Sequence, residues 1–505
     1  MTLNVVLVQL DSLNRHFLPT YGNSWVQAPH LTAFAARAQV FDRHFAGSLP
    51  CLPARREIWA GVQEFWWRGW GPLEPWDQPL PYLANRAGGT THLVTDHYHL
   101  FERGAGGYFE DFGTYDFVRG HEFDNWRTGP LGEIPAWAAP MVGRRGEGAR
   151  QYLRNVADFR DEADFFGPQV MARAAAWLRD APGRAPFFLH IDSFDVHEPF
   201  HVPGPYRSLY TDADPTRFNP WPRYGRTDDP GVVSGEEEVA WIRAQFAGKL
   251  TMLDRAFGGV LGALDAAGLW DSTAVLVTTD HGHYLGEHGR MGKPGSPLWH
   301  TLCHLPLFVW LPGGGSGVRR GALTQTVDLY ATVLDLLGIT PPPGSHSRSL
   351  LPVLRGETDT HREAAVYGYS GLRVGVTAGD WTLLRDHDPG AAPAHWYTHQ
   401  LGQLDARGED ARRNRPTTFN HLEAGPFIPG APLVWRTPVR HPEITGLHPP
   451  RPDLLYHNPG DPEQARDLAR ARPDMVRALE GRLADHMRSL GVPGEQFRRL
   501  RLEPG

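Results

Sequence analysis

Four short apolar runs in this chain share one feature that constrains its fold, because each ends in aspartate or histidine side chains. Continuous apolar runs of this length are typical of strands buried on both faces of a parallel sheet. Helical patterns lie between them, and this alternation predicts a doubly wound α/β fold with a mostly parallel sheet. The predicted strands are residues 5–10, 91–95, 187–191 and 274–279, with a further buried strand at 305–311. The predicted helices are residues 31–40, 169–178, 327–337 and 238–267, the last with a break near Gly258 and Gly259.

The ends of these predicted strands carry the side chains most suited to chemistry. In doubly wound folds, ligands bind beyond the carboxyl ends of the strands. A single aspartate there is usually a helix cap, but four strand ends rich in aspartate and histidine favour a metal or anion site. Asp11, Asp280 and His281 would offer a divalent cation two carboxylates and an imidazole. Oxygen ligands alone favour Ca²⁺ or Mg²⁺, and direct binding of the imidazole favours Mn²⁺ or Zn²⁺. His99 and His197 are candidates for acid–base work or for hydrogen bonds to substrate oxygens.

A second candidate feature is the segment around Cys51, one of two cysteines in the 505 residues. Pro53 suits the start of a helix and Gly61 suits its end, so Cys51 is expected just ahead of a short helix. Free backbone N–H groups and the positive end of the helix dipole favour an anion there. The forks of Arg55 and Arg56 suit the oxygens of a sulfate or phosphate group. The alternative is a buried cysteine that only packs in a tight turn.

Lysine occurs only at Lys249 and Lys293, and arginine supplies the other cationic side chains. Lys293 follows the strand end at residues 280–283 in a glycine-rich loop, where the backbone can come close to a ligand. Its compact ammonium predicts a point charge against an anionic oxygen. Lys249 lies in a helical pattern with no such setting and serves as the comparison.

Composition limits the function classes. A hydrophobic content of 41% and a charged content of 21% are ordinary for a soluble globular protein. The formal net charge of −7 gives no support to nucleic-acid binding. Two cysteines make no disulfide framework, and no apolar run approaches the ~20 residues that span a bilayer. No leader-like segment precedes the first predicted strand. These features predict a cytoplasmic enzyme without nucleic-acid or membrane partners.

Two domains are expected, with a boundary near residue 360. Residues 1–360 would form the catalytic α/β domain, and residues 361–505 a smaller α+β subdomain. The subdomain would contain a small antiparallel sheet at residues 365–369, 372–376 and 381–384 and a terminal helix at 473–490. Long irregular segments, which often form walls or lids of a site, are residues 64–82, 104–150 and 202–234. The tryptophans of residues 64–82 would either line a pocket or pack under the loop.

The segment Cys51-Leu52-Pro53-Ala54-Arg55 resembles the Cys-x-Pro-Ser/Ala-Arg signature of type I sulfatases, which belong to the alkaline phosphatase superfamily. Other parts of the family pattern follow along the whole chain. They are residues 9–15 with 21–22, 28–42, 279–289, 327–338 and 453–462. The resemblance implies an alkaline-phosphatase-like α/β fold and a hydrolase of sulfate esters.

The resemblance also implies how such a hydrolase works. A formylglycine-generating enzyme converts Cys51 to Cα-formylglycine, and the hydrated aldehyde attacks sulfur and expels the alcohol. Collapse of the second hydroxyl then releases sulfate and restores the aldehyde. The metal would be held by Asp11, residue 51, Asp280 and His281. Ca²⁺ is the first expectation for this ion, and Mn²⁺ is the alternative.

Five further side chains receive roles from the resemblance. Arg55 would steady the aldehyde hydrate. Lys293 and His197 would bind sulfate oxygens and assist the leaving group. His97 would bind substrate at a position where many sulfatases carry lysine, and His99 would be the base for the collapse step.

Three departures from the sulfatase pattern widen the choice of substrate. Ser12 stands where typical sulfatases carry a second aspartate, His281 replaces an asparagine, and His97 replaces the lysine. This set is more similar to the family's phosphonate monoester and phosphodiester hydrolases, which often use Mn²⁺. The first hypothesis is a sulfatase acting on a small-molecule or saccharide sulfate ester. The second is a phosphonate monoester or phosphodiester hydrolase. The third is a catalytically silent binding protein with an unmodified Cys51.

Overall fold

The centre of the fold is a mixed, mostly parallel β-sheet. The computed structural model describes residues 2–102, 105–293, 297–315, 317–388, 391, 395–399, 421–425, 428, 430–438 and 452–502. Within them nine strands form one sheet in the order β11-β2-β12-β8-β1-β6-β4-β5, with β13 paired to β2. The strands are β1 (Asn4–Leu10), β2 (Gln39–Phe45), β4 (Thr90–Thr95), β5 (Thr114–Phe117), β6 (Phe187–Ser193), β8 (Thr273–Thr278), β11 (His304–Leu305), β12 (Leu307–Trp310) and β13 (Arg319–Gln325).

The four strands predicted from apolar runs are confirmed as the middle of this sheet. β1 pairs in parallel with β6 on one side and with β8 on the other, and β4 pairs in parallel with β6 and β5. Every residue of β1, β6 and β8 is buried, as expected for strands covered on both faces. The sheet becomes antiparallel at β12, which pairs with β8 and β2.

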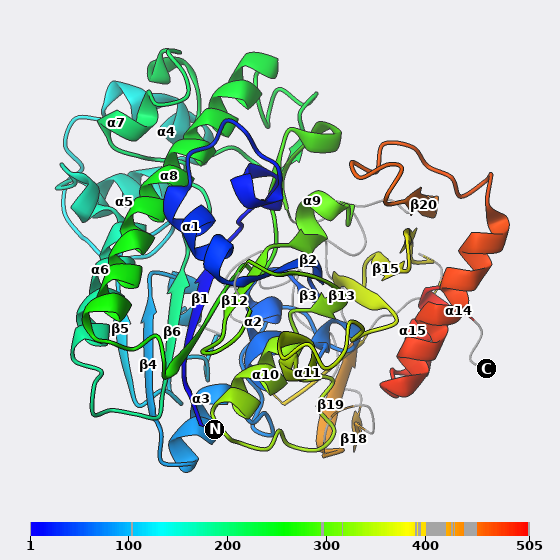
Figure 1. Cartoon of the computed structure of the whole chain (residues 1–505). Coiled ribbons are helices and arrows are strands. Elements are labelled where there is room, and N and C mark those ends of the chain that lie inside the picture. Colours follow the sequence, from blue (N-terminus) through cyan, green and yellow to red (C-terminus); the bar gives the residue numbers. More distant parts are fainter. Residues whose placement is uncertain are drawn as a thin grey trace.

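Helices cover both faces of the sheet (Figure 1). Successive side chains of a strand point to opposite faces, so the residues of β1 divide between two cores. Val6 and Val8 pack on the face of α8, and Val5 and Leu7 pack on the face of α10. The first face carries α1 (Pro29–Arg37), α6 (Phe166–Arg179) and α8 (Glu236–Ala266). The second carries α2 (Cys51–Ala60), α3 (Leu80–Arg86), α10 (Asp328–Leu336) and α11 (Leu351–Leu354).

Two helices differ from their predictions. α8 is one continuous helix of 31 residues, so the predicted break near Gly258 and Gly259 is wrong. A Cβ at Gly258 would lie 2.6 Å from Cε1 of His30, and glycine therefore serves close packing of α1 on α8. The helix predicted at residues 31–40 ends at Arg37, because residues 39–45 form β2.

A smaller sheet has the strand order β20-β16-β15-β14-β3. Its strands are β3 (Ser48–Leu49), β14 (Ala365–Tyr369), β15 (Val374–Ala378), β16 (Trp381–Arg385) and β20 (Leu454–His457). The predicted antiparallel meander is confirmed for β14, β15 and β16. However, β3 comes from the N-terminal part of the chain and pairs in parallel with β14, so the sheet is mixed rather than purely antiparallel. The predicted terminal helix is α14 (Pro473–Ser489), which packs in the core of this sheet. The domain boundary near residue 360 stays a prediction.

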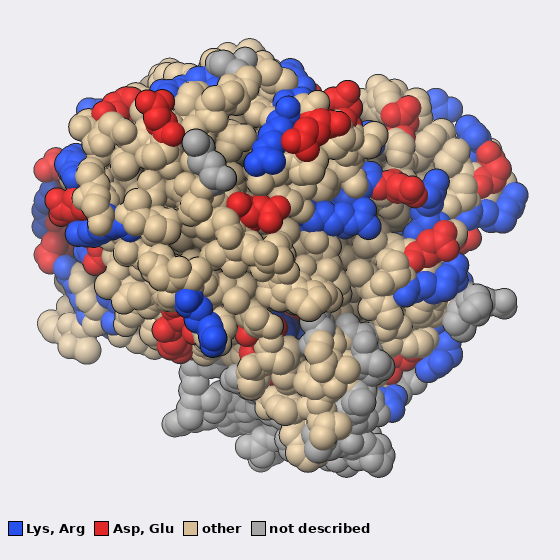
Figure 2. Space-filling view, turned by 60° about the horizontal axis from the view of Figure 1, so that its bottom comes forward, with Lys and Arg blue, Asp and Glu red and all other residues tan. Residues whose placement is uncertain are grey.

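Smaller elements complete the described part of the chain. Two three-stranded sheets are β7 (Gly225–Arg226) with β10 (Arg290–Gly292) and β9 (Tyr284–Leu285), and β17 (His395–Thr398) with β19 (Leu433–Pro438) and β18 (His421–Ala424). The remaining helices are α4 (Ala139–Arg145), α5 (Glu147–Asn155), α7 (Gly204–Arg207), α9 (His300–Cys303) and α15 (Gly494–Arg499). Figure 2 shows basic and acidic side chains interspersed over one face of the molecule. Among the described helices, none is long and apolar enough to cross a bilayer.

Candidate active site

The predicted meeting of aspartate and histidine side chains at one edge of the sheet is present. β8, β1, β6 and β4 are neighbours and run parallel, so their carboxyl ends lie side by side. Asp11 directly follows β1, and His97 comes shortly after β4. Asp280 and His281 come shortly after β8, and Asp192 lies near the end of β6. The edge of the sheet therefore gathers carboxylates and imidazoles from four strands.

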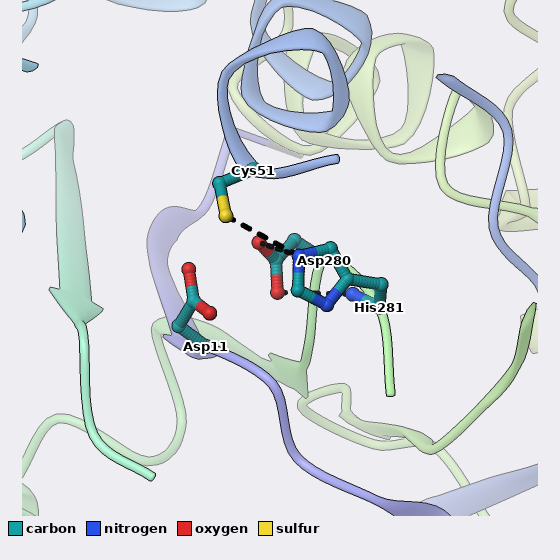
Figure 3. A group of neighbouring side chains, drawn as sticks. All are labelled: Asp11, Cys51, Asp280 and His281. Carbon is teal, nitrogen blue, oxygen red and sulfur yellow. Dashed lines mark hydrogen bonds and ion pairs between the residues drawn. The ribbon is translucent and has the colours of Figure 1, made fainter. Parts of the chain in front are cut away.

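Cys51 is the first residue of α2 rather than a residue ahead of it, and its side chain points towards Asp280 and His281 (Figure 3). Gly61 ends the helix in the left-handed region, at φ 71°, as its position predicted. Sγ of Cys51 lies 3.3 Å from Nε2 of His281 and 3.2 Å from Nζ of Lys293. Burial raises the pKa of the thiol well above its usual value. The sulfur thus faces polar and charged groups.

Asp11, Cys51, Asp280 and His281 form a group whose ligand atoms all lie within 4.8 Å of one another. Burial and the neighbouring Asp11 raise the pKa of Asp280 to about 7. At Asp11 burial acts in the raising direction, but Lys293 and Arg55, together with His97, outweigh it and hold the pKa of that carboxyl well below its usual range. Two buried carboxylates that repel each other, with an imidazole beside them, fit a divalent cation. These are the four residues to which the resemblance assigned a metal, and their role as ligands stays a prediction.

Arg55 fixes the carboxylates around this group. Its Nη1 donates to Oδ2 of Asp280 at 2.9 Å and to the carbonyl of Cys51 at 3.2 Å. Its Nη2 donates to Oδ2 of Asp11 at 3.0 Å. A bidentate pair with Asp192, at 2.9 and 2.7 Å, completes the set. These bonds engage all five guanidinium N–H groups, so Arg55 orients the site and has no N–H left for a substrate oxygen. Asp192, which anchors Arg55 in this way, received no role from the sequence.

Arg56 does not share this site. Its Nε donates to Oδ2 of Asp77 at 2.8 Å, and its Nη1 pairs with Glu64. All of these side chains are buried, on a different side of α2 from Arg55. The expectation that both forks bind a sulfate or phosphate is therefore wrong, because carboxylates of the protein already occupy the fork of Arg56 as they do that of Arg55.

Lys293 brings a positive charge to residue 51. Besides its contact with Cys51, Nζ donates to Oγ of Ser12 at 3.0 Å and lies 3.5 Å from Oδ1 of Asp11. Burial disfavours the ammonium, but the acidic groups around it, Cys51 and Asp11 foremost, outweigh burial and raise the pKa of Lys293. The hydroxyl of Ser12 in turn donates to Oδ1 of Asp11 at 2.7 Å. Ser12, which stands where typical sulfatases carry a second aspartate ligand, therefore orients the carboxylate of Asp11 by a hydrogen bond.

Known proteins match this chain along the same stretch that builds the site. Residues 3–339 match the family model described as "Sulfatase". This chain belongs to the sulfatase family. The choline-sulfatase of Rhizobium meliloti (strain 1021) is 26% identical over 414 residues, which cover 75% of this chain and 77% of that protein.

Solved structures confirm the predicted fold. The phosphonate monoester hydrolase of Agrobacterium radiobacter has a TM-score of 0.64 and 20% identity, and the match covers 97% of this chain and 95% of that one. A protein in complex with its substrate D-glucosamine-2-N,6-O-disulfate has a TM-score of 0.63 and 15% identity, with coverage of 97% and 98%. Members of this fold thus include proteins that act on phosphonate monoesters and on a sulfated saccharide.

The other histidines of this sulfatase-family site differ in charge. Burial and Arg55 lower the pKa of His97 well below its usual value, and its Nε2 lies 3.4 Å from Oδ2 of Asp11. Burial and Lys293 likewise lower the pKa of His197. At His99 burial acts in the same direction, but the carboxylates of Glu102 and Glu122 outweigh it and raise its pKa to about 9. At neutral pH the site therefore combines one imidazolium with neutral imidazoles.

Lys249 is not the featureless comparison that its helical pattern suggested. Its ammonium is buried, lies 2.6 Å from Oδ1 of Asp195 and donates to the carbonyls of His197, at 2.6 Å, and Pro199, at 3.1 Å. α8 thus holds the loop that carries His197. The prediction missed this role because Lys249 and its partners are far apart in the sequence.

The tryptophans of residues 64–82 mainly pack, and Trp67 and Trp76 also line a cavity next to Arg56 and Asp77. Trp66 and Trp67 are buried in the core of the smaller sheet. Trp70 instead packs edge-on against His99, with ring centroids 5.0 Å apart. Most of this segment is therefore packing, and Trp70 is its contribution to the surroundings of the site.

Proposed function

We propose that this protein hydrolyses a sulfate monoester to an alcohol and inorganic sulfate, with residue 51, converted to formylglycine, as the nucleophile. The observation that carries this proposal is the place of Cys51 at the buried start of α2. Its Sγ lies between the Lys293 ammonium, at 3.2 Å, and Nε2 of His281, at 3.3 Å. The same position borders both carboxylates of the predicted metal group. The Lys293 ammonium, the predicted metal ligands and the precursor of the nucleophile are thus neighbours.

A divalent cation would be held by Asp11, Asp280, His281 and residue 51. When bound, it supplies Lewis-acid activation of an oxygen nucleophile and neutralises developing charge. The resemblance favours Ca²⁺, whereas the imidazole in the donor set supports Mn²⁺. Arg55 keeps both aspartates oriented towards this position. Hydration of formylglycine would supply one hydroxyl for attack and a second for release of the product.

The remaining polar side chains suit an anionic substrate. Lys293 attracts sulfate oxygens, and the neutral imidazoles of His97 and His197 are available for hydrogen bonds to them. His99 is protonated at neutral pH, which suits a proton donor better than the base that the resemblance implies. Nε2 of His197 suits the base instead, because its Nδ1–H donates to the carbonyl of Glu198 at 2.9 Å.

The second candidate is a phosphonate monoester or phosphodiester hydrolase with the same nucleophile. Ser12 and His281 favour it, because they leave the metal group with two carboxylates and an imidazole. For either reaction, the expected partners are the ester substrate and a formylglycine-generating enzyme.

Mass spectrometry and a substrate panel test the proposal. The tryptic peptide that ends at Arg55 should carry the mass of formylglycine at residue 51. An unmodified thiol in the native host would contradict the nucleophile and favour the silent binding protein. The modified enzyme is then assayed with an aryl sulfate, an aryl phosphonate monoester and a bis-aryl phosphate, each with Ca²⁺ and with Mn²⁺. If the sulfate is the poorest substrate by orders of magnitude, the second candidate replaces the first.

A further inference from the structure

Glu122 is a buried carboxylate at the site to which no role has been given. It lies in the loop between β5 and α4, two elements that interrupt the segment 104–150 predicted to be irregular, and its backbone adopts φ 44° in the left-handed region. Residues other than glycine rarely adopt this conformation, and it persists where the surroundings hold it firmly. The side chain is only 6% exposed. The fold therefore holds this carboxylate in a fixed place.

Its two oxygens face two different histidines. Oε2 of Glu122 lies 3.6 Å from Nε2 of His99, and Oε1 lies 3.3 Å from Nδ1 of His197. Tyr98 neighbours the same carboxylate, and burial together with Glu122 raises the pKa of its hydroxyl well above the usual value. Phe194 completes the arrangement, because its ring stacks on His197 and packs edge-on against His99. One carboxylate thus bridges imidazoles that come from the ends of β4 and β6.

The groups around His99 explain its charge. Nδ1 lies 3.0 Å from Oε1 of Glu102, so a carboxylate faces each ring nitrogen. Tyr98 from the same segment and the neutral His97 are the other titratable neighbours. His197 meets Glu122 through Nδ1, which donates to the carbonyl of Glu198 and lies 3.3 Å from Oε2 of the same residue. Its other titratable neighbours are Tyr224, whose hydroxyl lies 3.5 Å from Nε2, and Lys293. An acid and a base are recognised by surroundings that push their proton affinities apart, and these two imidazoles have such surroundings.

We infer that Glu122 is a positioning residue that fixes the imidazoles of His99 and His197 as the proton donor and the proton acceptor of one reaction. The inference rests on the proposed function for the reaction itself. The bridge is a property of the folded chain and exists whichever ester is hydrolysed. Its test therefore has one part that needs no turnover.

That part is a histidine titration by NMR in the unmodified full-length protein. The ring carbons are labelled with ¹³C, and the His99 resonance is assigned from its loss in His99→Asn. The wild-type resonance should titrate near pH 9. In Glu122→Gln the midpoint should fall by about one pH unit, because Glu102 alone then favours the imidazolium. Glu133→Gln, the same change at an exposed residue of the same stretch, should leave it unchanged.

The second part uses the formylglycine enzyme and its best ester from the panel. Glu122→Gln should lower kcat about tenfold to a hundredfold with little change in KM. It should also move the alkaline limb of the pH–rate profile to lower pH. Glu122→Asp keeps the negative charge but moves it away from the two imidazoles, because the side chain is one methylene shorter. It should therefore lower kcat while largely preserving the titration of His99. Far-UV circular dichroism establishes that each variant is folded.

An unchanged His99 titration in folded Glu122→Gln would overturn the inference, even for a chain that hydrolyses no ester. A shifted titration with wild-type kcat and pH profile would also overturn it, because the bridge would then be structural. Absence of turnover in the wild-type formylglycine protein would instead contradict the proposed function. The two failures are therefore distinguishable.

Discussion

Replacing Arg55 with methionine removes the one cation that pairs with three buried carboxylates. The guanidinium is completely buried and binds Asp11, Asp192 and Asp280 at 2.7–3.0 Å. Removing one partner of a buried ion pair costs about 3–5 kcal/mol, because the other charge is left uncompensated. A typical domain is stable by roughly 5–15 kcal/mol, so Arg55→Met should lose a large share of its stability. A bound cation would compensate part of this charge, and the measurement is therefore made in chelator.

Urea denaturation followed by circular dichroism measures the effect. Arg217→Met is the matched control, because Arg217 makes two hydrogen bonds of 2.7 Å to Glu237 and these side chains are 54% and 61% exposed. Solvent screens such a pair, so the control should unfold close to the wild type. In Arg55→Met the unpaired carboxylates take up protons in the folded state, and lowering the pH should narrow its difference from the wild type. Equal urea midpoints for the two variants at pH 8 would refute the reasoning.

Four further outcomes are expected. Cys51→Ala should abolish turnover without unfolding the protein, and Cys303→Ala, at the other buried cysteine, should also stay folded. Wild-type activity in Cys51→Ala would contradict the nucleophile assignment. Burial raises the pKa of Glu57 to about 7 from 4.5, so its ionised form destabilises the fold as pH rises. Glu57→Gln should therefore raise stability at pH 8 by about 3 kcal/mol and not at pH 4, as urea denaturation would measure. Ca²⁺ or Mn²⁺ should raise the melting temperature of the wild type but not of Asp280→Asn, and equal shifts would exclude this metal group. Lys249→Met should lower the melting temperature by leaving a buried carboxylate unpaired, and an unchanged melting curve would contradict that pairing.

The sequence predicted the parts of the fold that repeat a simple pattern. β1, β6 and β8 are buried on both faces and read as continuous apolar runs. β2 escaped prediction because Asp42 and Arg43 interrupt its apolar residues, and both are only partly buried in the structure. The break expected in α8 was wrong because Gly258 allows α1 to pack closely on α8, and the periodicity of the sequence does not show such a contact.

For the candidate site, the sequence located the side chains that directly follow strands. Asp11, Asp280 and His281 stand at such places, and Cys51 was recognised from the motif that it begins. Glu122 lies in an irregular stretch and acts through residues distant in sequence, so no local pattern marks it. Charge states were equally hidden, since they depend on which groups become buried together.

The pairing of β3 with β14 would set a time limit on the maturation proposed for residue 51. β3 ends two residues before Cys51, and β14 begins at Ala365, so the strand that holds the entrance to α2 is synthesised long after the cysteine. Once both are paired, Cys51 is 2% exposed at the start of a helix whose residues are all buried. The enzyme proposed to modify this side chain would therefore have to reach it before the two strands pair. Delay of the C-terminal part, or its truncation, would lengthen that interval and should increase the fraction of modified protein.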